Sequence, residues 1–291
     1  MWTNYHTHSQ FCDGSAGLHA IVSAAQRLSM PAIGISSHAP LPFQKRWSMK
    51  TENLRRYLGE IKTLKRKRVG IQVYTGLEVD YIPSQISPSD FVQLLDYTIG
   101  SIHFVDRLPD GSPWEIDSSL SAFKAGLSAI FRNNVRAAVS RYFELTREMI
   151  INGRPDIVGH LDKIKIHNRH YPFFRENEGW YRAEINETLD VIRHAGTIVE
   201  VNTRGIYTGK TDDVYPSRWI LKLISEKSIP VTLSSDAHHP SELLNGFASA
   251  APVLVESGIQ TLMVLNDGIW KPLRYNDKGL VLPGTSAYAV A

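Results

Sequence analysis

The chain has 291 residues, and 43% of them are hydrophobic, which is enough for one α/β barrel or for two ordinary domains. Thirty-two Lys and Arg residues against 29 Asp and Glu give a formal charge of +3, too small to indicate a nucleic-acid or membrane partner. Cys12 is the only cysteine, which excludes an internal disulfide and favours a reducing compartment. No run approaches the ~18 apolar residues of a membrane span and no signal peptide is evident, so we expect a cytoplasmic protein.

Short β-rich runs alternate with longer amphipathic stretches along the chain. Strands are expected at residues 2–6, 32–36, 71–79, 97–104, 156–161, 197–203 and 230–239. Helices are expected at residues 17–30, 52–68, 88–95, 183–195, 217–227 and 242–256, and a long helical region at 121–151 is broken near Asn133 and Asn134. The basic run "KTLKRKR", residues 62–68, closes the second helix, where cations face the negative end of the helix dipole; we favour this over an RNA-binding patch.

No repeat, low-complexity segment or linker interrupts this alternation, so a single domain over residues 1–291 is expected. Alternating strands and helices are typical of a parallel sheet with helical crossovers. Seven or eight such units in a chain of this length favour a closed (β/α) barrel over an open sheet. The run "TLMVL", residues 261–265, would be the eighth strand, and the pattern leaves open whether it completes the barrel.

The stretch "NYHTHSQFCDG", residues 4–14, holds His6 and His8 one residue apart, with Asp13 just beyond. Such a pair is weak evidence by itself, because 11 histidines in 291 residues give roughly 0.4 such pairs by chance. The stronger observation is that every one of the seven expected strands ends on a potential ligand or polar group. These residues are His6, His8, His38, Glu78, His103, His160, Asn202, Arg204, Asp236 and His238.

In a barrel, the C-terminal ends of the strands meet on one face, where active sites are built. Side chains two residues apart in an extended segment point to the same side, so His6 and His8 can reach one ion. The same holds for Asp236 and His238. Imidazole and carboxylate groups together suit Zn²⁺, Mn²⁺ or Fe, and so many of them indicate two or three ions.

The motifs "HTH", "CDG", "SSHAP", "GLEVDY", "GSIHF", "GHLDK", "EVNTRG" and "SSDAHHP" follow one another between about residues 4 and 250. In this order they resemble the PHP (polymerase and histidinol phosphatase) family, and specifically its histidinol-phosphate phosphatase branch. The resemblance implies a distorted (β/α)7 barrel with a trinuclear metal centre at the C-terminal ends of the strands. It implies three ligand sets: His6, His8, Glu78 and Asp236 for one ion; Glu78 as a bridge, with His103 and His160, for a second; Asp13, His38 and His238 for the third.

The resemblance also implies an activity, the hydrolysis of L-histidinol phosphate to L-histidinol and inorganic phosphate in histidine biosynthesis. Water held between metal ions is acidified enough to supply hydroxide near neutral pH, while the ions neutralise charge on the phosphoryl oxygens. Hydroxide would then attack phosphorus in line with the leaving alkoxide. The expected partner is therefore a small phosphate ester, with no nucleic acid and no membrane, and the sequence carries no feature that sets an oligomeric state.

Residues beyond the ligands are assigned from their positions. Arg204 follows the sixth strand, where it is placed to bind phosphate oxygens bidentately. Asp162 is a candidate general acid, although an acid beside a ligand more often orients that ligand. The loop "PWEIDS" supplies Trp114, Glu115 and Asp117, whose aromatic face and carboxylates suit the imidazole and ammonium of histidinol phosphate; a plain structural loop is the alternative.

Two other functions remain open at this level. The same metal centre could serve a different ester, such as a nucleotide, a phosphotyrosine peptide or a nucleic-acid end, because a fold and its metals do not fix specificity. A metal-binding domain without catalysis is the third interpretation. It predicts eroded ligand positions, whereas all nine are present.

Overall fold

The computed structural model describes residues 1–67 and 70–281, so Arg68, the last residue of the expected second helix, lies outside the described residues. Six strands form a parallel sheet in the order β1-β2-β3-β6-β7-β8. Their bounds are Ala32–Ile35, Gln72–Asp80, Tyr97–Ser101, Ile157–Val158, Ile198–Asn202 and Val231–Ser234. Every residue of β1, β3, β6, β7 and β8 is buried, as expected for parallel strands covered on both faces.

The expected first strand takes the seventh position in this sheet. It pairs through isolated parallel bridges rather than a continuous ladder: Asn4 with Ile33 of β1, and Thr7 with Ala237 just beyond β8. The backbone N–H of His8 also donates to the Ala237 carbonyl, at 2.8 Å. Because this segment joins both edges of the sheet, the sheet curls into the distorted barrel that the sequence predicts.

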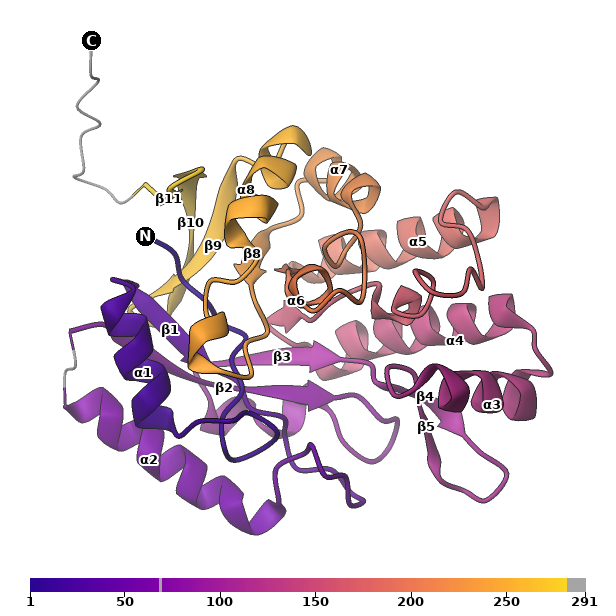
Figure 1. Ribbon diagram of the computed structural model, residues 1–291, viewed down its shortest axis with the longest axis horizontal. Coiled ribbons are helices and arrows are strands. Elements are labelled where there is room, and N and C mark those ends of the chain that lie inside the picture. Colours follow the sequence, from indigo (N-terminus) through magenta and orange to yellow (C-terminus); the bar gives the residue numbers. More distant parts are fainter. Residues whose placement is uncertain (68–69, 282–291) are drawn as a thin grey trace.

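Helices connect most of the strands and cover the sheet (Figure 1). The α-helices are α1 (Leu18–Arg27), α2 (Leu54–Arg66), α3 (Leu120–Phe131), α4 (Val135–Glu148), α5 (Gly179–Ala195), α6 (Arg204–Tyr207), α7 (Arg218–Glu226) and α8 (Phe247–Glu256). The predicted break in the long helical region is confirmed, since Asn134 caps α4 by accepting from the Ala137 N–H at 3.1 Å. No helix of residues 1–67 and 70–281 is long and apolar enough to cross a membrane.

Several expected elements differ in detail. The helix predicted at 88–95 is two 3-10 turns, Pro88–Asp90 and Val92–Leu94. Gly246, with φ 78°, delays the start of α8. The strand expected at 97–104 ends at Ser101, and the chain continues into a small hairpin of β4 (Phe104–Arg107) and β5 (Pro113–Glu115).

The run "TLMVL" forms a strand, but outside the barrel. It lies in β9 (Thr261–Asn266), which pairs antiparallel with β10 (Ile269–Asn276); β11 (Gly279–Leu280) completes this three-stranded sheet. Figure 1 shows β9 and β10 at the edge of the molecule, next to β8. The parallel sheet therefore has seven strand positions and not eight.

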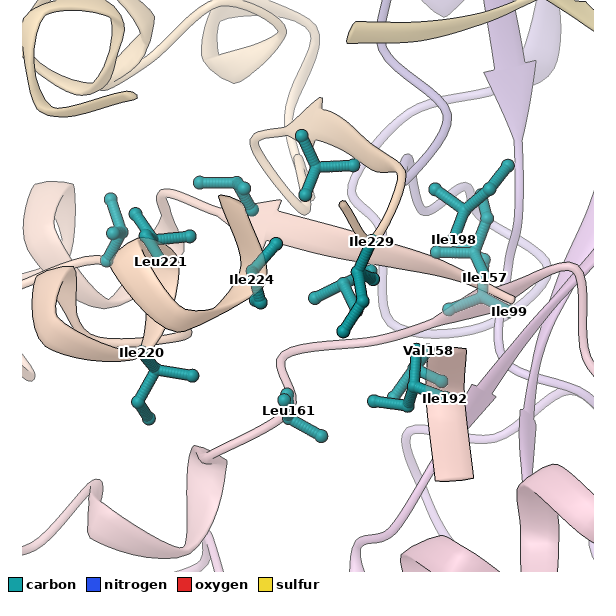
Figure 2. Close-up of a cluster of buried hydrophobic side chains, with 14 of the residues drawn as sticks. Ile99, Ile157, Val158, Leu161, Ile192, Ile198, Ile220, Leu221, Ile224 and Ile229 are labelled. Atoms are coloured by element: carbon teal, nitrogen blue, oxygen red, sulfur yellow. The ribbon is translucent and has the colours of Figure 1, made fainter. Parts of the chain in front are cut away.

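Aliphatic side chains fix the sheet to its helices. Figure 2 shows Ile157 and Ile198 of neighbouring strands in one cluster with Ile192 of α5 and Ile220 and Ile224 of α7. All five are buried, and each side chain of this size contributes about 1.5–3 kcal/mol on burial. This packing holds the strands in register, so the positions of their C-terminal ends are well defined.

Candidate metal centre

The strand ends bring the predicted ligand residues together. Four groups of side chains each have one nitrogen or oxygen atom per residue within 4.8 Å of one another. The groups are His6, His8 and Asp236; Glu78, His103 and His160; His8, Asp13, His38 and His238; and His38, Asp80 and His103. All nine predicted ligand residues belong to at least one group.

Glu78, near the C-terminal end of β2, lies at the centre of the cluster. Its Oε2 atom is 3.1 Å from His6 Nε2 and 3.1 Å from His38 Nδ1. Its Oε1 atom is 2.9 Å from His160 Nε2 and 3.6 Å from His103 Nε2. The two oxygens of one buried carboxylate thus face two different sets of histidines, which is the geometry a bridging ligand requires.

Asp13 and His238 form the outer corner. Asp13 Oδ2 is 3.2 Å from His238 Nε2, and Asp13 Oδ1 is 4.0 Å from His38 Nε2. The turn that presents Asp13 needs the glycine after it, because a Cβ atom on Gly14 would lie 2.4 Å from the Ser9 nitrogen. The Asp13 side chain is 32% exposed, so this corner is the most open to solvent.

Two residues of the cluster have left-handed backbone conformations. His160 has φ 21° and Asp236 has φ 53°, and both lie just beyond the ends of their strands. Such conformations cost about 1–3 kcal/mol for residues other than glycine and cluster at functional sites. The turn at His160 also explains why β6 ends at Val158, earlier than its apolar pattern predicts.

Five buried polar atoms of the cluster make no hydrogen bond of acceptable geometry within the described part of the chain. They are His6 Nε2, His8 Nε2, His38 Nδ1, His160 Nδ1 and Asp236 Oδ1. A buried polar group without a hydrogen bond costs about 1–3 kcal/mol, so five in one place need an explanation. Burial lowers the pKa of His8 to about 4 and that of His38 to about 3, which keeps both imidazoles in the neutral form that binds metals. This donor set fits a multinuclear metal site.

Two further carboxylates orient the histidine rings. Glu200 of β7 has Oε1 2.6 Å from His6 Nδ1, and its Oε2 accepts a hydrogen bond from the backbone N–H of His160 at 2.8 Å. Asp80 of β2 has Oδ1 2.9 Å from His103 Nδ1. With Nδ1 held in this way, Nε2 of His6 and of His103 points at the cluster.

The sequence reasoning missed both carboxylates, although the signal was present. Glu200 precedes Asn202 by two residues and Asp80 follows Glu78 by two. In a strand this spacing places the two side chains on the same face.

A cavity of about 230 Å³ opens over the cluster. It is lined by Asp13, His38, Trp47, Glu78, His103, Glu115, Asp117, Lys163, Arg204, Asp236 and His238. Arg204 is therefore where an anion-binding residue is expected, and its Nη1 donates to the Asp236 carbonyl at 2.9 Å and to the Tyr207 hydroxyl at 3.0 Å. Trp47 and Lys163 were not among the predicted site residues.

The prediction for Trp114 is wrong. Its side chain is only 2% exposed and packs against Phe123 and Phe131, with ring centroids 5.3 and 5.7 Å apart. Gly126 leaves it room, since a Cβ atom there would lie 2.0 Å from Trp114 Nε1. Trp114 is a core residue that anchors β5 to α3, and it does not line the cavity.

Asp162 also lies outside the cavity, which corrects its assignment as general acid. It is fully buried, and its Oδ2 accepts from the Ser217 N–H at 3.0 Å and lies 2.7 Å from Lys165 Nζ. These contacts tie the turn after β6 to the start of α7.

Glu115 and Asp117 line the cavity as expected, but both already have cationic neighbours. The Glu115 oxygens contact Lys45 Nζ at 2.7 Å and Trp47 Nε1 at 3.1 Å. Asp117 Oδ2 lies 2.9 Å from Lys163 Nζ. Less negative charge is therefore available to a cationic substrate than the sequence alone indicates.

A cluster of buried histidines and carboxylates at the C-terminal ends of a curled parallel sheet is the kind of site that metal-dependent hydrolases use. The family model for the PHP domain matches residues 4–204, and the chain belongs to this family. It is thus a PHP-family metal-dependent phosphoesterase, as the resemblance of its motifs implies.

Relatives are similar over most of their length. The chain is 26% identical over 270 residues to a "Probable histidinol-phosphatase" of Deinococcus radiodurans, covering 88% of this chain and 94% of that protein. It is 27% identical over 265 residues to the histidinol-phosphatase of Bacillus subtilis, covering 84% and 96%. A crystal structure of histidinol phosphate phosphatase from Lactococcus lactis, complexed with zinc, L-histidinol and phosphate, superposes with a TM-score of 0.71 at 20% identity, covering 93% of this chain and 98% of that one. That likeness shows the fold.

Proposed function

We propose that this chain is a histidinol-phosphatase, which hydrolyses L-histidinol phosphate to L-histidinol and inorganic phosphate. Support comes from relatives that carry this name and align over most of both chains. The observation that carries the chemistry is Glu78, whose two oxygens face different histidines beneath a cavity that also contains Arg204.

In this proposal the three ligand sets implied by the motifs hold divalent Zn, Mn or Fe. The first is His6, His8, Glu78 and Asp236, the second Glu78, His103 and His160, and the third Asp13, His38 and His238. Each set overlaps one of the groups in which the donor atoms lie within 4.8 Å. When bound, the ions would supply acidified water as nucleophile and neutralise charge on the phosphoryl oxygens.

Arg204 orients the phosphoryl group in this scheme. The described polar contacts of its guanidinium involve Nη1 alone, so Nε and Nη2 are free to donate two parallel hydrogen bonds to phosphate oxygens. The guanidinium is held over the cluster by the Asp236 carbonyl, and this contact fixes its distance from the metal ligands.

The leaving group would lie against Trp47, which replaces Trp114 as the aromatic face. The Trp47 ring centroid is 4.5 Å from that of His38, and the indole N–H donates to Glu115. An imidazole can stack on such a face, and Glu115 offers a carboxylate beside it.

A second candidate is a PHP-type phosphatase for an ester without an ammonium group. The observation in its favour is that Glu115 and Asp117, the carboxylates expected to meet that ammonium, form ion pairs with Lys45 and Lys163. A nucleotide, a phosphotyrosine peptide or a nucleic-acid end would not need them free.

A phosphate-release screen separates the two candidates. Histidinol phosphate, nucleotides, sugar phosphates and a phosphotyrosine peptide are compared with Zn²⁺, Mn²⁺ or Fe²⁺ added. We expect kcat/KM for histidinol phosphate to exceed the others by at least about a hundredfold. A strong preference for another ester would overturn the substrate but leave the chemistry, whereas no release from any ester would overturn both.

A further inference from the structure

The three-stranded sheet of β9, β10 and β11 lies beyond residues 4–204, which the family model matches, and none of its residues belongs to the ligand groups. It contacts the barrel where the chain leads into the ligand segment, residues 4–8. The Leu280 N–H of β11 donates to the Met1 carbonyl at 2.7 Å, and Figure 1 shows the start of the chain beside this sheet. Gly279, with φ 133°, permits this close approach, because a Cβ atom there would lie 2.3 Å from the Met1 oxygen.

Tyr5, in the middle of the ligand segment, joins it directly to β9. The Tyr5 hydroxyl accepts from the Leu265 N–H at 2.9 Å and donates to the Leu265 carbonyl at 3.3 Å, and the side chain is fully buried. Leu265 lies opposite Trp270 in the β9–β10 hairpin. The Trp270 ring packs edge-on against the Tyr5 ring, with centroids 5.0 Å apart. One side chain therefore contacts both strands of the hairpin.

The Tyr5 hydroxyl takes the place that a neighbouring strand would fill. Within residues 1–67 and 70–281, β9 forms a ladder with β10 alone, so the backbone groups on its other edge need different partners. Tyr5 supplies them at Leu265, and the Thr232 hydroxyl of β8 donates to the Met263 carbonyl at 3.1 Å. The hairpin is thus held to the barrel by side-chain hydroxyls at this edge, and Tyr5 lies next to a predicted metal ligand.

The ligand segment needs support from outside the parallel sheet. It lies in that sheet through isolated bridges rather than a ladder, so fewer backbone hydrogen bonds hold it than hold β1 or β8. Successive side chains of an extended segment point in opposite directions: the His6 Nε2 atom lies 3.1 Å from Glu78, whereas Tyr5 contacts the hairpin. Adjacent Cα atoms are a fixed distance of about 3.8 Å apart, so a displacement of Tyr5 also moves the His6 imidazole.

We propose that Tyr5 is a positioning residue for the metal centre, and that the β9–β10 hairpin acts through it to set the location of the His6 imidazole. This inference rests on the metal centre of the proposed function and not on the identity of the ester. The hairpin then takes part in metal binding although it supplies no ligand.

Tyr5→Phe tests this role, because it removes the hydroxyl and keeps the ring. Co²⁺ is titrated into the metal-free full chain, bound ions are followed by visible absorption, and a competing chelator gives the Kd of each. We expect the Kd of one ion to rise about tenfold and its absorption bands to change, since both depend on how firmly a ligand is oriented.

The matched control is the same change in β10, Tyr275→Phe. The Tyr275 hydroxyl donates to the Ile259 carbonyl at 2.6 Å, away from the ligand segment. We expect each Kd for Co²⁺ in this variant to stay within about twofold of wild type, because the lost hydrogen bond does not act on a ligand.

Two further measurements separate positioning from general destabilisation. We expect similar Tm values for the two metal-free variants, and faster hydrogen exchange in the peptide of residues 2–9 only in Tyr5→Phe. Equal Kd values in the two variants would overturn the proposal, and so would a uniform weakening of all ions in Tyr5→Phe with a much lower Tm.

The outcome also distinguishes this inference from the proposed function. If wild type hydrolyses histidinol phosphate and the two variants bind Co²⁺ alike, the role of Tyr5 fails and the function stands. If Tyr5→Phe alone weakens Co²⁺ binding but wild type prefers another ester, the substrate assignment fails and the role of Tyr5 stands.

Discussion

The two ends of the parallel sheet carry cavities of very different size and chemistry. The cavity at the N-terminal ends of the strands is about 770 Å³ and is lined largely by apolar side chains, including Ile150, Val191, Met263 and Trp270. The cavity at the C-terminal ends is about 230 Å³ and is lined by histidines, carboxylates and two cations. The smaller cavity is therefore the one with the means to do chemistry, and volume is a poor guide to the active site here.

Polar groups at the two ends also differ in how they are satisfied. At the N-terminal end, Asp156 accepts from the Thr98 N–H at 2.8 Å, and His194 Nδ1 lies 2.6 Å from the Asp190 carbonyl oxygen. At the C-terminal ends of the strands, buried atoms such as His6 Nε2 make no hydrogen bond of acceptable geometry in the described chain. Five such atoms gather in the cluster, and this concentration indicates the site.

Removing residues 1–10 should have the largest effect. The deletion takes away His6 and His8 together with the segment that joins β1 to β8. We expect no measurable phosphatase activity and a loss of bound metal. Metal analysis measures the bound metal, and circular dichroism reports whether the truncated protein folds. A truncated protein that keeps its metal and activity would show that the cluster does not depend on this segment.

His160→Ala tests the metal-ligand cluster at the C-terminal ends of the strands without removing the segment that joins β1 to β8. It removes a nitrogen 2.9 Å from Glu78 Oε1, so kcat should fall by about a thousandfold or more and about one equivalent of metal should be lost. The matched control is His194→Ala at the other cavity, for which kcat should stay within about twofold. Similar losses in both variants would contradict the contrast between the two ends.

Arg204→Ala should have a smaller effect and a different signature. If Arg204 binds the phosphoryl group, KM for a phosphomonoester should rise about tenfold or more, with a lesser change in kcat. Arg154→Ala, at the larger cavity, is the corresponding control. Steady-state kinetics measure KM for both variants. An equal KM in Arg204→Ala and Arg154→Ala would refute phosphoryl binding by Arg204.

Ala195→Phe should have the smallest effect. Ala195 is exposed at the end of α5 and lines the larger cavity, so a phenyl ring there reduces its volume. We expect kcat/KM to remain within about twofold of wild type and Tm to change little. A marked loss of activity would mean that the N-terminal cavity takes part in function.

Strands and loops differ in how regularly their side chains are placed, and this difference explains which site residues could be predicted from the sequence. His38, Glu78 and His103 follow or end apolar runs, and parallel strands deliver their ends to one face, so the cluster could be assembled without coordinates. Glu200 and Asp80 were within reach of the same reasoning, because they share a strand face with residues already assigned.

Side chains on loops and turns were not predictable in this way. The stretch "PWEIDS" was expected to be a loop, but its first three residues form strand β5, in which Trp114 turns into the core and the neighbouring Glu115 turns into the cavity. Trp47 comes from the long loop after β1, and Lys163 from a 3-10 turn, and both reach the site only through tertiary contacts.

The pairing of "TLMVL" was likewise outside the local pattern. Its apolar residues predict a strand and it is one, but its partner is β10, which begins three residues after β9 ends. A short connection of this kind favours an antiparallel hairpin, so β9 pairs with β10 even though α8 precedes it as a crossover helix would.

The most direct test of the central claim is the metal content of the purified protein after reconstitution with Zn²⁺, Mn²⁺ or Fe²⁺ and removal of loosely bound ions. Elemental analysis should give about two to three equivalents per chain, falling in His160→Ala but not in His194→Ala. Less than about one equivalent in carefully reconstituted wild-type protein would contradict a multinuclear centre at the C-terminal ends of the strands.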